Sequence, residues 1–293
     1  MSRKKVIVSP ISQRNILKNF GYEAGKVLGT GTYSKVYVVT DQTRKKLACK
    51  VVRKKDAGDA FITKFLPREL KIVANIKHPN IVQVYQVIDT KQSVYMLMDF
   101  CEKGDLLEYI RMHGPFAVEK CKSIFKQVVD AVHYLHNLDV AHRDIKCENV
   151  FLTQKGSAKL GDFGFSRYCK DKAGEDLMSN TFCGSKAYAA PEILRGQFYD
   201  PKKYDIWSLG VVLYVMLTAT MPFDDTRPKQ MLKSQLSNSI KRVTAFWDDC
   251  PKNVKDLQVA LLEQDVKQRI DIANVVEHSW FKGDAISKIK QRF

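Results

Sequence analysis

Two short stretches of the sequence concentrate side chains that can bind metal and transfer protons. The first, AHRDIKCENV, contains Asp144, Lys146 and Asn149, and the second, KLGDFGF, contains Asp162. Mg²⁺ prefers a few oxygen ligands together with substrate phosphates, so Asn149 and Asp162 suit a magnesium ion bridged to a nucleotide. Asp144 could then orient an attacking hydroxyl and accept its proton, while Lys146 stabilises charge on a transferred phosphoryl group.

A glycine-rich segment and a lysine nearer the N-terminus could bind the phosphates. In LGTGTYSKV (28–36), Gly29 and Gly31 would let backbone N–H groups approach a phosphate closely. Taken alone, this segment is more simply interpreted as a hairpin turn without a ligand. Lys50 ends the strand-like run that follows, and Glu69 could pair with its ammonium group from an expected helix.

The elements that would position these residues fall into two regions. Residues 1–21 are polar and unpatterned, and we expect no regular element there. Periodicity predicts a helix over 61–76 and several strands in the first hundred residues. The predicted strands cover 27–39, 47–52, 81–88 and 94–100.

The periodicity changes from strands to helices beyond the stretch CEKGD (101–105), which we expect to be the hinge between two lobes. The apolar run 206–217 is interrupted by Ser208 and Gly210, which favours a buried helix over a membrane span. A sheet-rich lobe followed by a helical lobe predicts an α+β fold. The predicted helices cover 105–112, 117–138, 204–217 and 254–262.

Composition limits the partners and the compartment. The net charge of +16 favours anionic partners, but no basic-aromatic pattern marks a dedicated nucleic-acid site. Seven cysteines without a CxxC pair argue against both a disulfide framework and a zinc site. The start lacks the apolar stretch of a secretory signal. We therefore expect a cytoplasmic location, with the nucleus as an additional one, and no membrane partner.

The motifs occur in the order found in protein kinases: Gly-rich turn, strand Lys, helix Glu, HRDxKxxN, DFG and APE. The chain resembles a eukaryotic protein kinase over residues 22–281, and Lys146 with GSKAYAAPE resembles the serine/threonine type. FLPREL, DIKCENV, TFCGS, YDPKKYDIWSLGVVLYVM and MPFDD are similar to the testis-specific serine/threonine kinases, within the calcium/calmodulin-dependent-kinase-like group.

This resemblance implies a bilobal protein kinase fold with a small, mainly β N-lobe and a larger, mainly α C-lobe. The expected boundaries are an N-terminal extension (1–21), the kinase domain (22–281) and a short tail (282–293). Within the domain, we expect the N-lobe at 22–100, the hinge at 99–104 and the C-lobe at 105–281.

The resemblance also implies the nucleotide and substrate contacts. Met98 would be the gatekeeper, Asp99 to Cys101 would bind adenine, and Asp105 would bind ribose. Glu148 would line the substrate groove and favour a basic residue N-terminal to the acceptor. The implied nucleotide-binding residues are Leu28, Gly29, Thr30, Gly31, Val36, Ala48, Lys50, Glu69, Met98, Asp99, Cys101 and Asp105.

Regulation is implied at Thr181, which matches a position that related kinases phosphorylate. Arg143 and Arg167 would bind that phosphate through charge-assisted hydrogen bonds. Other residues resemble scaffold positions: Glu192 and Arg269 a buried ion pair, and Asp205 a brace for the catalytic loop. The chain departs from the family pattern at Ser34, Cys49 and Lys186, and Lys186 replaces the small apolar residue expected after GS.

We therefore expect an ATP- and Mg²⁺-dependent serine/threonine protein kinase that acts on protein substrates. The family likeness further implies a role in male germ-cell differentiation and dependence on a chaperone or an upstream kinase. Two alternatives are a non-catalytic scaffold of the pseudokinase type and a nucleic-acid-binding protein. The intact Lys50, Asp144, Asn149 and Asp162 argue against the scaffold.

Overall fold

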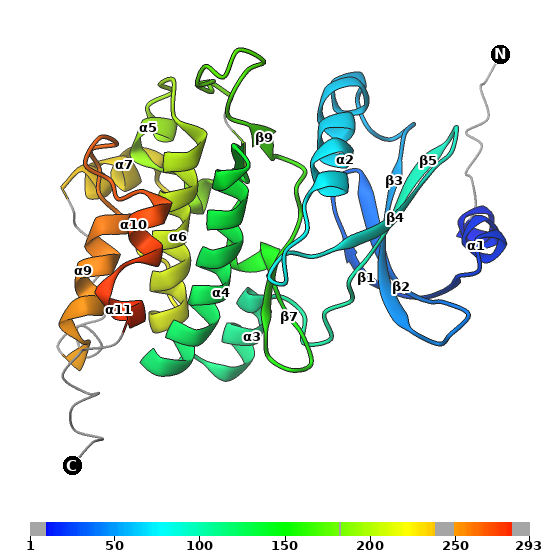
Figure 1. Ribbon diagram of the computed structural model, residues 1–293, viewed down its shortest axis with the longest axis horizontal. Helices are drawn as coiled ribbons and strands as arrows, with labels where there is room; N and C mark the ends of the chain where they lie inside the picture. Colours follow the sequence, from blue (N-terminus) through cyan, green and yellow to red (C-terminus); the bar gives the residue numbers. More distant parts are fainter. Residues whose placement is uncertain (1–9, 182, 238–248, 283–293) are drawn as a thin grey trace. The chain divides into compact units, whose positions relative to one another are not determined.

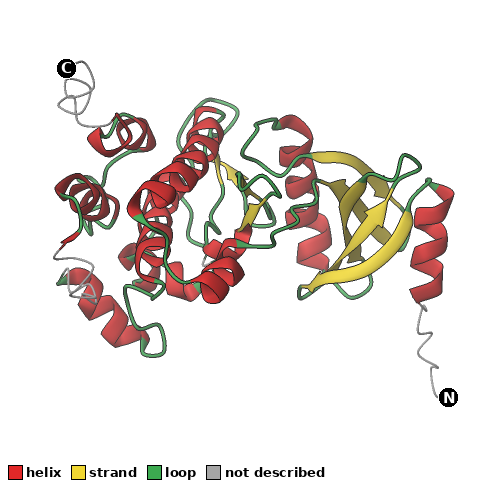
Figure 2. Ribbon diagram, turned by 90° about the horizontal axis from the view of Figure 1, so that it is seen from below, coloured by secondary structure: helices red, strands yellow, loops and turns green. Residues whose placement is uncertain are grey.

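The computed structural model describes residues 10–181, 183–237 and 249–282. It divides into two compact units: Met1–Pro67 with Val82–Phe100, and Arg68–Ile81 with Cys101–Phe293. Strands dominate the first unit and helices the second (Figures 1 and 2). The predicted α+β, two-lobe fold is therefore confirmed.

The N-terminal unit contains one antiparallel sheet with the strand order β1-β2-β3-β5-β4. All four predicted strand regions form strands of this sheet. The 27–39 region is a hairpin of two strands, as its central glycines indicated. The strands are β1 (Glu23–Thr30), β2 (Ser34–Thr40), β3 (Lys46–Arg53), β4 (Val84–Asp89) and β5 (Ser93–Met98).

The register of the sheet gathers four of the implied nucleotide-binding residues on one face. Val36 pairs with Lys50, and Ala48 pairs with Met98. Directly paired residues share a face of a sheet, and so do residues two apart on one strand. Val36, Ala48, Lys50 and Met98 therefore project from the same face, and Leu47, Cys49 and Val51 project from the other.

The other face is covered by a helix in the segment that we expected to lack regular structure. Helix α1 (Pro10–Asn19) buries Leu17 to 1% exposure against the sheet. The expectation was wrong because packing against the sheet, rather than an amphipathic pattern, supports this ten-residue helix. Leu17 joins a buried cluster of Val39, Leu47, Cys49, Val51, Ile88, Tyr95 and Leu97.

The predicted 61–76 helix begins as a π-helical turn (Phe61–Phe65) and continues as α2 (Leu66–Asn75). The predicted helices of the C-terminal unit are also present, together with shorter elements. The helices are α3 (Leu106–His113), α4 (Val118–Asn137), α5 (Pro191–Leu194), α6 (Pro201–Thr218), α7 (Pro228–Leu236), α9 (Lys252–Leu261), α10 (Ile272–Val276) and α11 (Ser279–Lys282).

Helix α6 is the central element of the C-terminal unit. Every residue from Tyr204 to Thr218 is buried, as expected for a helix that is apolar on all sides. Asp200 caps its N-terminus by accepting a hydrogen bond from the N–H of Lys202 at 2.8 Å. Among the described residues, no helix combines the length and hydropathy of a membrane span.

Candidate active site

Asp205 on α6 fixes the backbone at the start of the catalytic loop (residues 142–149). Its carboxylate accepts hydrogen bonds from the backbone N–H groups of His142 (2.8 Å) and Arg143 (2.7 Å). His136 on α4 lies 2.9 Å from the same carboxylate. These contacts hold Arg143 at a φ of 64°, a conformation that non-glycine residues adopt only where the surroundings require it.

Asp144 follows this anchored pair and is held by three neighbours. Its Oδ2 accepts a hydrogen bond from the Asn149 side-chain amide at 2.9 Å and lies 2.9 Å from the Lys146 ammonium. Its Oδ1 accepts one from the backbone N–H of Ser185 at 3.1 Å. Asp144, Lys146 and Asn149 are thus brought together, and the carboxylate orientation is fixed.

Asn149 and Asp162 lie at the two ends of one β-hairpin. Strands β7 (Val150–Leu152) and β8 (Ala158–Leu160) pair antiparallel, and the N–H of Gly161 donates to the carbonyl of Asn149 at 2.9 Å. The Asn149 amide nitrogen donates to Asp144, so the orientation of the side chain leaves its oxygen for another partner. Asp162 is exposed and has a φ of 59°.

These two oxygen donors fit Mg²⁺, which keeps several waters or phosphate oxygens as ligands. Within the described part of the chain, no group of three or more His, Cys, Asp or Glu side chains could enclose a metal by itself. That Asn149 and Asp162 hold Mg²⁺ together with nucleotide oxygens stays a prediction.

Glu69 on α2 reaches the segment that follows Asp162. It is 3% exposed, and a Cβ added to Gly164 would lie 3.7 Å from its Oε2 and 3.5 Å from Oδ1 of Asp162. Glu69 and Asp162 therefore approach the same glycine. Lys50 belongs to the N-terminal unit and Glu69 to the C-terminal unit, so their pairing stays a prediction.

The predicted phosphate-contacting turn follows strand β1. Leu28, Gly29 and Thr30 end that strand and are exposed. The N–H of Gly31 donates to the carbonyl of Ser34 at 2.8 Å, which closes a tight turn into β2. The exposed backbone of this turn is available to a ligand.

Asp99 in the predicted hinge and Asp105 just beyond it have structural partners for their side chains. The Asp99 carboxylate accepts hydrogen bonds from the Tyr85 hydroxyl at 2.5 Å and the Gln83 N–H at 3.0 Å. Asp105 caps α3 by accepting from the N–H three residues later, at 2.9 Å. The units divide between Phe100 and Cys101, inside the predicted hinge.

Sequence reasoning missed Ser185, which links the activation segment (residues 162–192) to Asp144, the candidate base. Besides its N–H contact with Asp144, its hydroxyl accepts a hydrogen bond from Lys146 at 2.9 Å. Glu148, the predicted substrate-groove residue, accepts one from the Tyr188 hydroxyl at 3.2 Å. The segment 185–188 therefore runs along the catalytic loop, a contact that a separation of about 40 residues conceals in the sequence.

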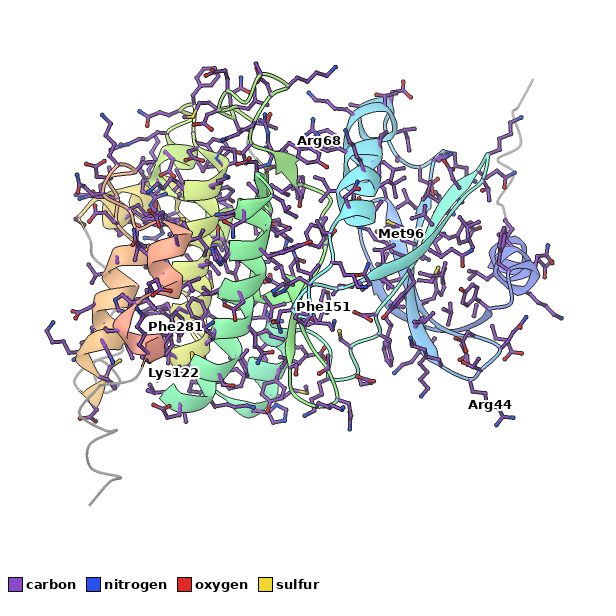
Figure 3. The ribbon with its side chains drawn as sticks, in the orientation of Figure 1. Arg44, Arg68, Met96, Lys122, Phe151 and Phe281 are labelled. Atoms are coloured by element: carbon purple, nitrogen blue, oxygen red, sulfur yellow. The ribbon has the colours of Figure 1, made fainter. Side chains whose placement is uncertain are left out.

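Three arginines gather beside the activation segment: the predicted Arg143 and Arg167, and Arg68, which sequence reasoning missed. Figure 3 labels Arg68 on α2. Burial lowers the pKa of Arg68, and repulsion from Arg143 and Arg167 lowers it further. Burial and the Arg143 charge lower the pKa of Arg167 in the same way. Such mutual repulsion favours an anion at this position.

Thr181 is exposed, so its hydroxyl is accessible to a modifying enzyme. In this structure Arg143 donates instead to the Ser179 hydroxyl at 3.1 Å and to the Tyr199 hydroxyl at 3.4 Å. The Tyr199 hydroxyl in turn donates to the Thr181 carbonyl at 2.9 Å. Thr181 and Arg143 are thus connected through Tyr199.

A buried ion pair anchors the end of the activation segment. Arg269 donates to both carboxylate oxygens of Glu192, at 2.7 and 3.0 Å. Two more of its N–H groups donate to the carbonyls of Glu263 (2.8 Å) and Lys203 (3.0 Å). The pair implied by the sequence is therefore present, and both carboxylate oxygens of Glu192 are hydrogen-bonded.

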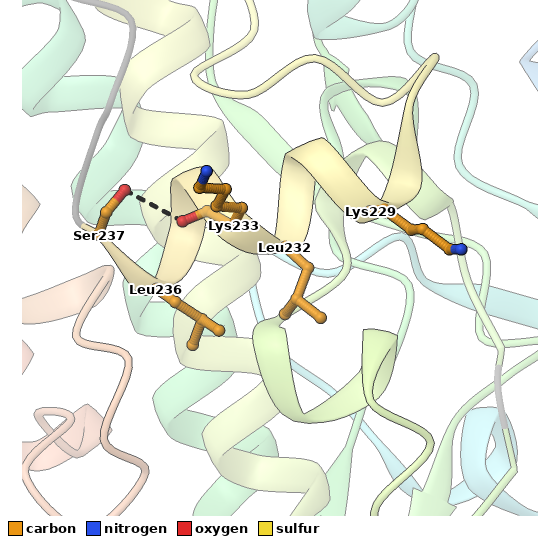
Figure 4. Close-up of a pocket in the computed structure, with 5 residues that line it drawn as sticks. All are labelled: Lys229, Leu232, Lys233, Leu236 and Ser237. Atoms are coloured by element: carbon orange, nitrogen blue, oxygen red, sulfur yellow. Dashed lines mark hydrogen bonds between the residues drawn. The ribbon is translucent and has the colours of Figure 1, made fainter.

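A pocket elsewhere in the C-terminal unit contains none of the predicted site residues. It lies on helix α7 (Figure 4). Its lining consists of Lys229, Leu232, Lys233, Leu236 and Ser237. The candidate active site is the group of residues around Asp144, and this pocket is separate from it.

The fold and this site define a protein kinase. The protein kinase domain family matches residues 22–281, which is nearly the whole chain. The chain belongs to this family and is a serine/threonine protein kinase, as the resemblance implied.

Within the family, the chain is similar to the testis-specific serine/threonine kinases, to which it belongs. It is 42% identical to mouse (Mus musculus) testis-specific serine/threonine-protein kinase 1 over 92% of this chain and 74% of that protein. It is 43% identical to the human (Homo sapiens) kinase 3 over 91% and 98%, respectively. It is 35% identical to CBL-interacting serine/threonine-protein kinase 19 of Arabidopsis thaliana over 89% and 53%.

Proposed function

We propose that this kinase transfers the γ-phosphoryl group of ATP, with Mg²⁺, to Ser or Thr hydroxyls of protein substrates. The observation that carries the proposal is the arrangement of Asp144, whose two carboxylate oxygens are held by Asn149, Lys146 and the Ser185 N–H. A carboxylate fixed in this way can orient an incoming hydroxyl without first reorganising.

In the proposed reaction, the acceptor oxygen forms a bond to the γ-phosphorus as the bond from that phosphorus to the ADP oxygen breaks. Asp144 orients the hydroxyl and takes its proton, and Lys146 stabilises negative charge on the transferred group. Asn149 and Asp162 would hold Mg²⁺, which, when bound, neutralises charge on the phosphate oxygens. Lys50 would bind phosphates from the sheet face that also carries Val36 and Ala48.

The test is transfer of labelled phosphate from Mg²⁺-ATP to a basic protein, followed by phosphoamino-acid analysis. We expect label on Ser or Thr, and Asp144→Asn should lower the rate about 10²- to 10⁴-fold, the usual contribution of a general base. Lys50→Met should also reduce transfer. Asp256→Asn, an equal charge change on the exposed surface of α9, is the matched control.

Retention of the full rate by Asp144→Asn would contradict the assigned role of this residue. The alternative function is a scaffold that binds nucleotide without transferring phosphate. Nucleotide binding by a natural chain that labels no substrate, even with phosphate on Thr181, would favour that alternative.

Regulation by phosphorylation of Thr181 is part of the proposal. Its support is the cluster of Arg68, Arg143 and Arg167, because a phosphate would relieve their mutual repulsion. Thr181→Ala should lower activity, and mass spectrometry should find the phosphate in the natural chain. Phosphate on Thr181 of an Asp144→Asn protein would identify an upstream kinase rather than autophosphorylation. A chaperone partner would be sought by co-purification.

We further propose a role in male germ-cell differentiation and a cytoplasmic location, with the nucleus as an additional one. The support is similarity to kinases whose names call them testis-specific. Antibody staining of testis and other tissues of the source organism tests both points. Equal abundance in all tissues would contradict the germ-cell role, and staining of a membrane compartment would contradict the location.

A further inference from the structure

Lys186 directly follows Ser185, the residue that contacts the candidate base. It is exposed and begins the 3₁₀ turn Lys186–Tyr188. The residue before it, Ser185, contacts Asp144 through its N–H at 3.1 Å and Lys146 through its hydroxyl at 2.9 Å. Within residues 10–181, 183–237 and 249–282, the Lys186 ammonium makes no hydrogen bond or ion pair.

The turn that carries Lys186 is fixed at both ends. Ser185 is tied to Asp144, and Tyr188 donates through its hydroxyl to Glu148 at 3.2 Å and accepts from the Cys147 N–H at 3.3 Å. Tyr188 itself is buried. The base of the Lys186 side chain is therefore held in a constant place along the catalytic loop, while its charged end remains in solvent.

The reach of this side chain defines which substrate residues it can meet. One residue of extended chain spans about 3.3–3.6 Å, and adjacent Cα atoms lie about 3.8 Å apart. A substrate hydroxyl bound at Asp144 would lie next to Ser185, which contacts that carboxylate at 3.1 Å. The flexible four-carbon stem of Lys186 begins one residue further along the chain. The ammonium can meet side chains one or two positions from the acceptor.

We propose that Lys186 is a specificity-determining residue, which selects protein substrates with Asp or Glu one or two positions from the phosphorylated Ser or Thr. This inference rests on the proposed phosphate transfer to proteins. The attraction acts at an exposed site, so it changes the choice among substrates more than the stability of the kinase.

The experiment compares peptides that differ only in having Glu, Gln or Lys at position −2, −1, +1 or +2 from one Ser. Each exposed charge interaction is worth a factor of about 1.4–5, so Glu over Lys at the contacted position should gain about 2- to 25-fold in kcat/KM. Lys186→Glu should reverse this order. Lys172→Glu changes the same charge at another exposed place in the activation segment and should keep it.

Lys186→Gln provides a second, neutral variant if the charge reversal impairs folding, and it should abolish the difference between Glu and Gln peptides. Fluorescence anisotropy of labelled peptides gives a readout of binding that is separate from turnover. An unchanged preference in Lys186→Glu and Lys186→Gln, or the same reversal in Lys172→Glu, overturns the inference alone. Absence of phosphate transfer to any peptide overturns the proposed function together with it.

Discussion

Replacing Gly184 by alanine should destabilise the C-terminal unit and slow phosphate transfer at the same time. Gly184 has a φ of 84°, and a Cβ on it would lie 2.7 Å from the Arg143 carbonyl oxygen. The Tyr204 hydroxyl would lie at 2.9 Å and Oδ1 of Asp144 at 3.1 Å. The closest atom belongs to backbone that Asp205 holds through two hydrogen bonds, so it cannot move aside easily.

Gly174→Ala is a matched control, because it measures the free-energy cost of the positive φ without the close contacts. Gly174, in the same activation segment, has a φ of 87° with nothing within 4 Å of an added Cβ. Alanine at such a φ costs about 1–2 kcal/mol, and overpacking costs about 1–3 kcal/mol more. Gly174→Ala should therefore lower the free energy of unfolding by about 1–2 kcal/mol, and Gly184→Ala by about 2–5 kcal/mol.

Urea unfolding and initial rates of peptide phosphorylation measure the two effects. A misplacement of about 1 Å can reduce a rate about 10²-fold, so kcat of Gly184→Ala should fall by at least about tenfold. Gly174→Ala should retain the natural kcat. Equal midpoints of unfolding and equal rates in the two variants would refute the close contact between Gly184 and the catalytic loop.

Three further predictions concern stability. Leu17→Ala should destabilise the N-terminal unit by about 2–5 kcal/mol, seen as faster hydrogen exchange in β3; an unchanged exchange rate would mean that α1 does not support the sheet. Glu192→Gln should cost about 3–5 kcal/mol, because it leaves the buried Arg269 cation without its carboxylate, and a urea midpoint equal to that of the natural chain would contradict this. Burial lowers the pKa of His78, so the unfolded chain takes up this proton first and stability should fall as the pH drops below about 6.5. His78→Gln should reduce that slope, and an identical pH dependence would exclude His78 as its source.

Much of the fold followed from local pattern, because β-branched runs and helical spacing coincided with the elements that form. Helix α1 could not be predicted in this way. Its apolar Ile16 and Leu17 are adjacent in sequence, so they do not form an apolar stripe at helical spacing. The burial of Leu17 is explained only by the sheet that this side chain covers.

In the candidate site, too, residues that are close in the sequence were predicted, and contacts between distant residues were not. Asp144 and Asn149 were identified because they lie within six residues of each other in one dense polar stretch. The contact between Ser185 and Asp144 and the approach of Arg68 to Arg143 join residues far apart in the chain. No periodicity or spacing reports such contacts, so they required the folded structure.

Arg143 connects the activation segment with the candidate base through its own backbone and side chain. Its N–H is bound by Asp205, its carbonyl faces Gly184, and its guanidinium contacts Ser179. Asp144 is the next residue along the same backbone. A negative charge that attracts the Arg143 guanidinium would therefore act one residue from the Asp144 carboxylate. Because Asp205 holds the Arg143 N–H, a movement of the guanidinium would be transmitted to Asp144 and not lost in a shift of the backbone between them. Coupling of this kind would require no long path of contacts, since Arg143, which contacts the activation segment, and Asp144, the candidate base, are neighbours in the chain.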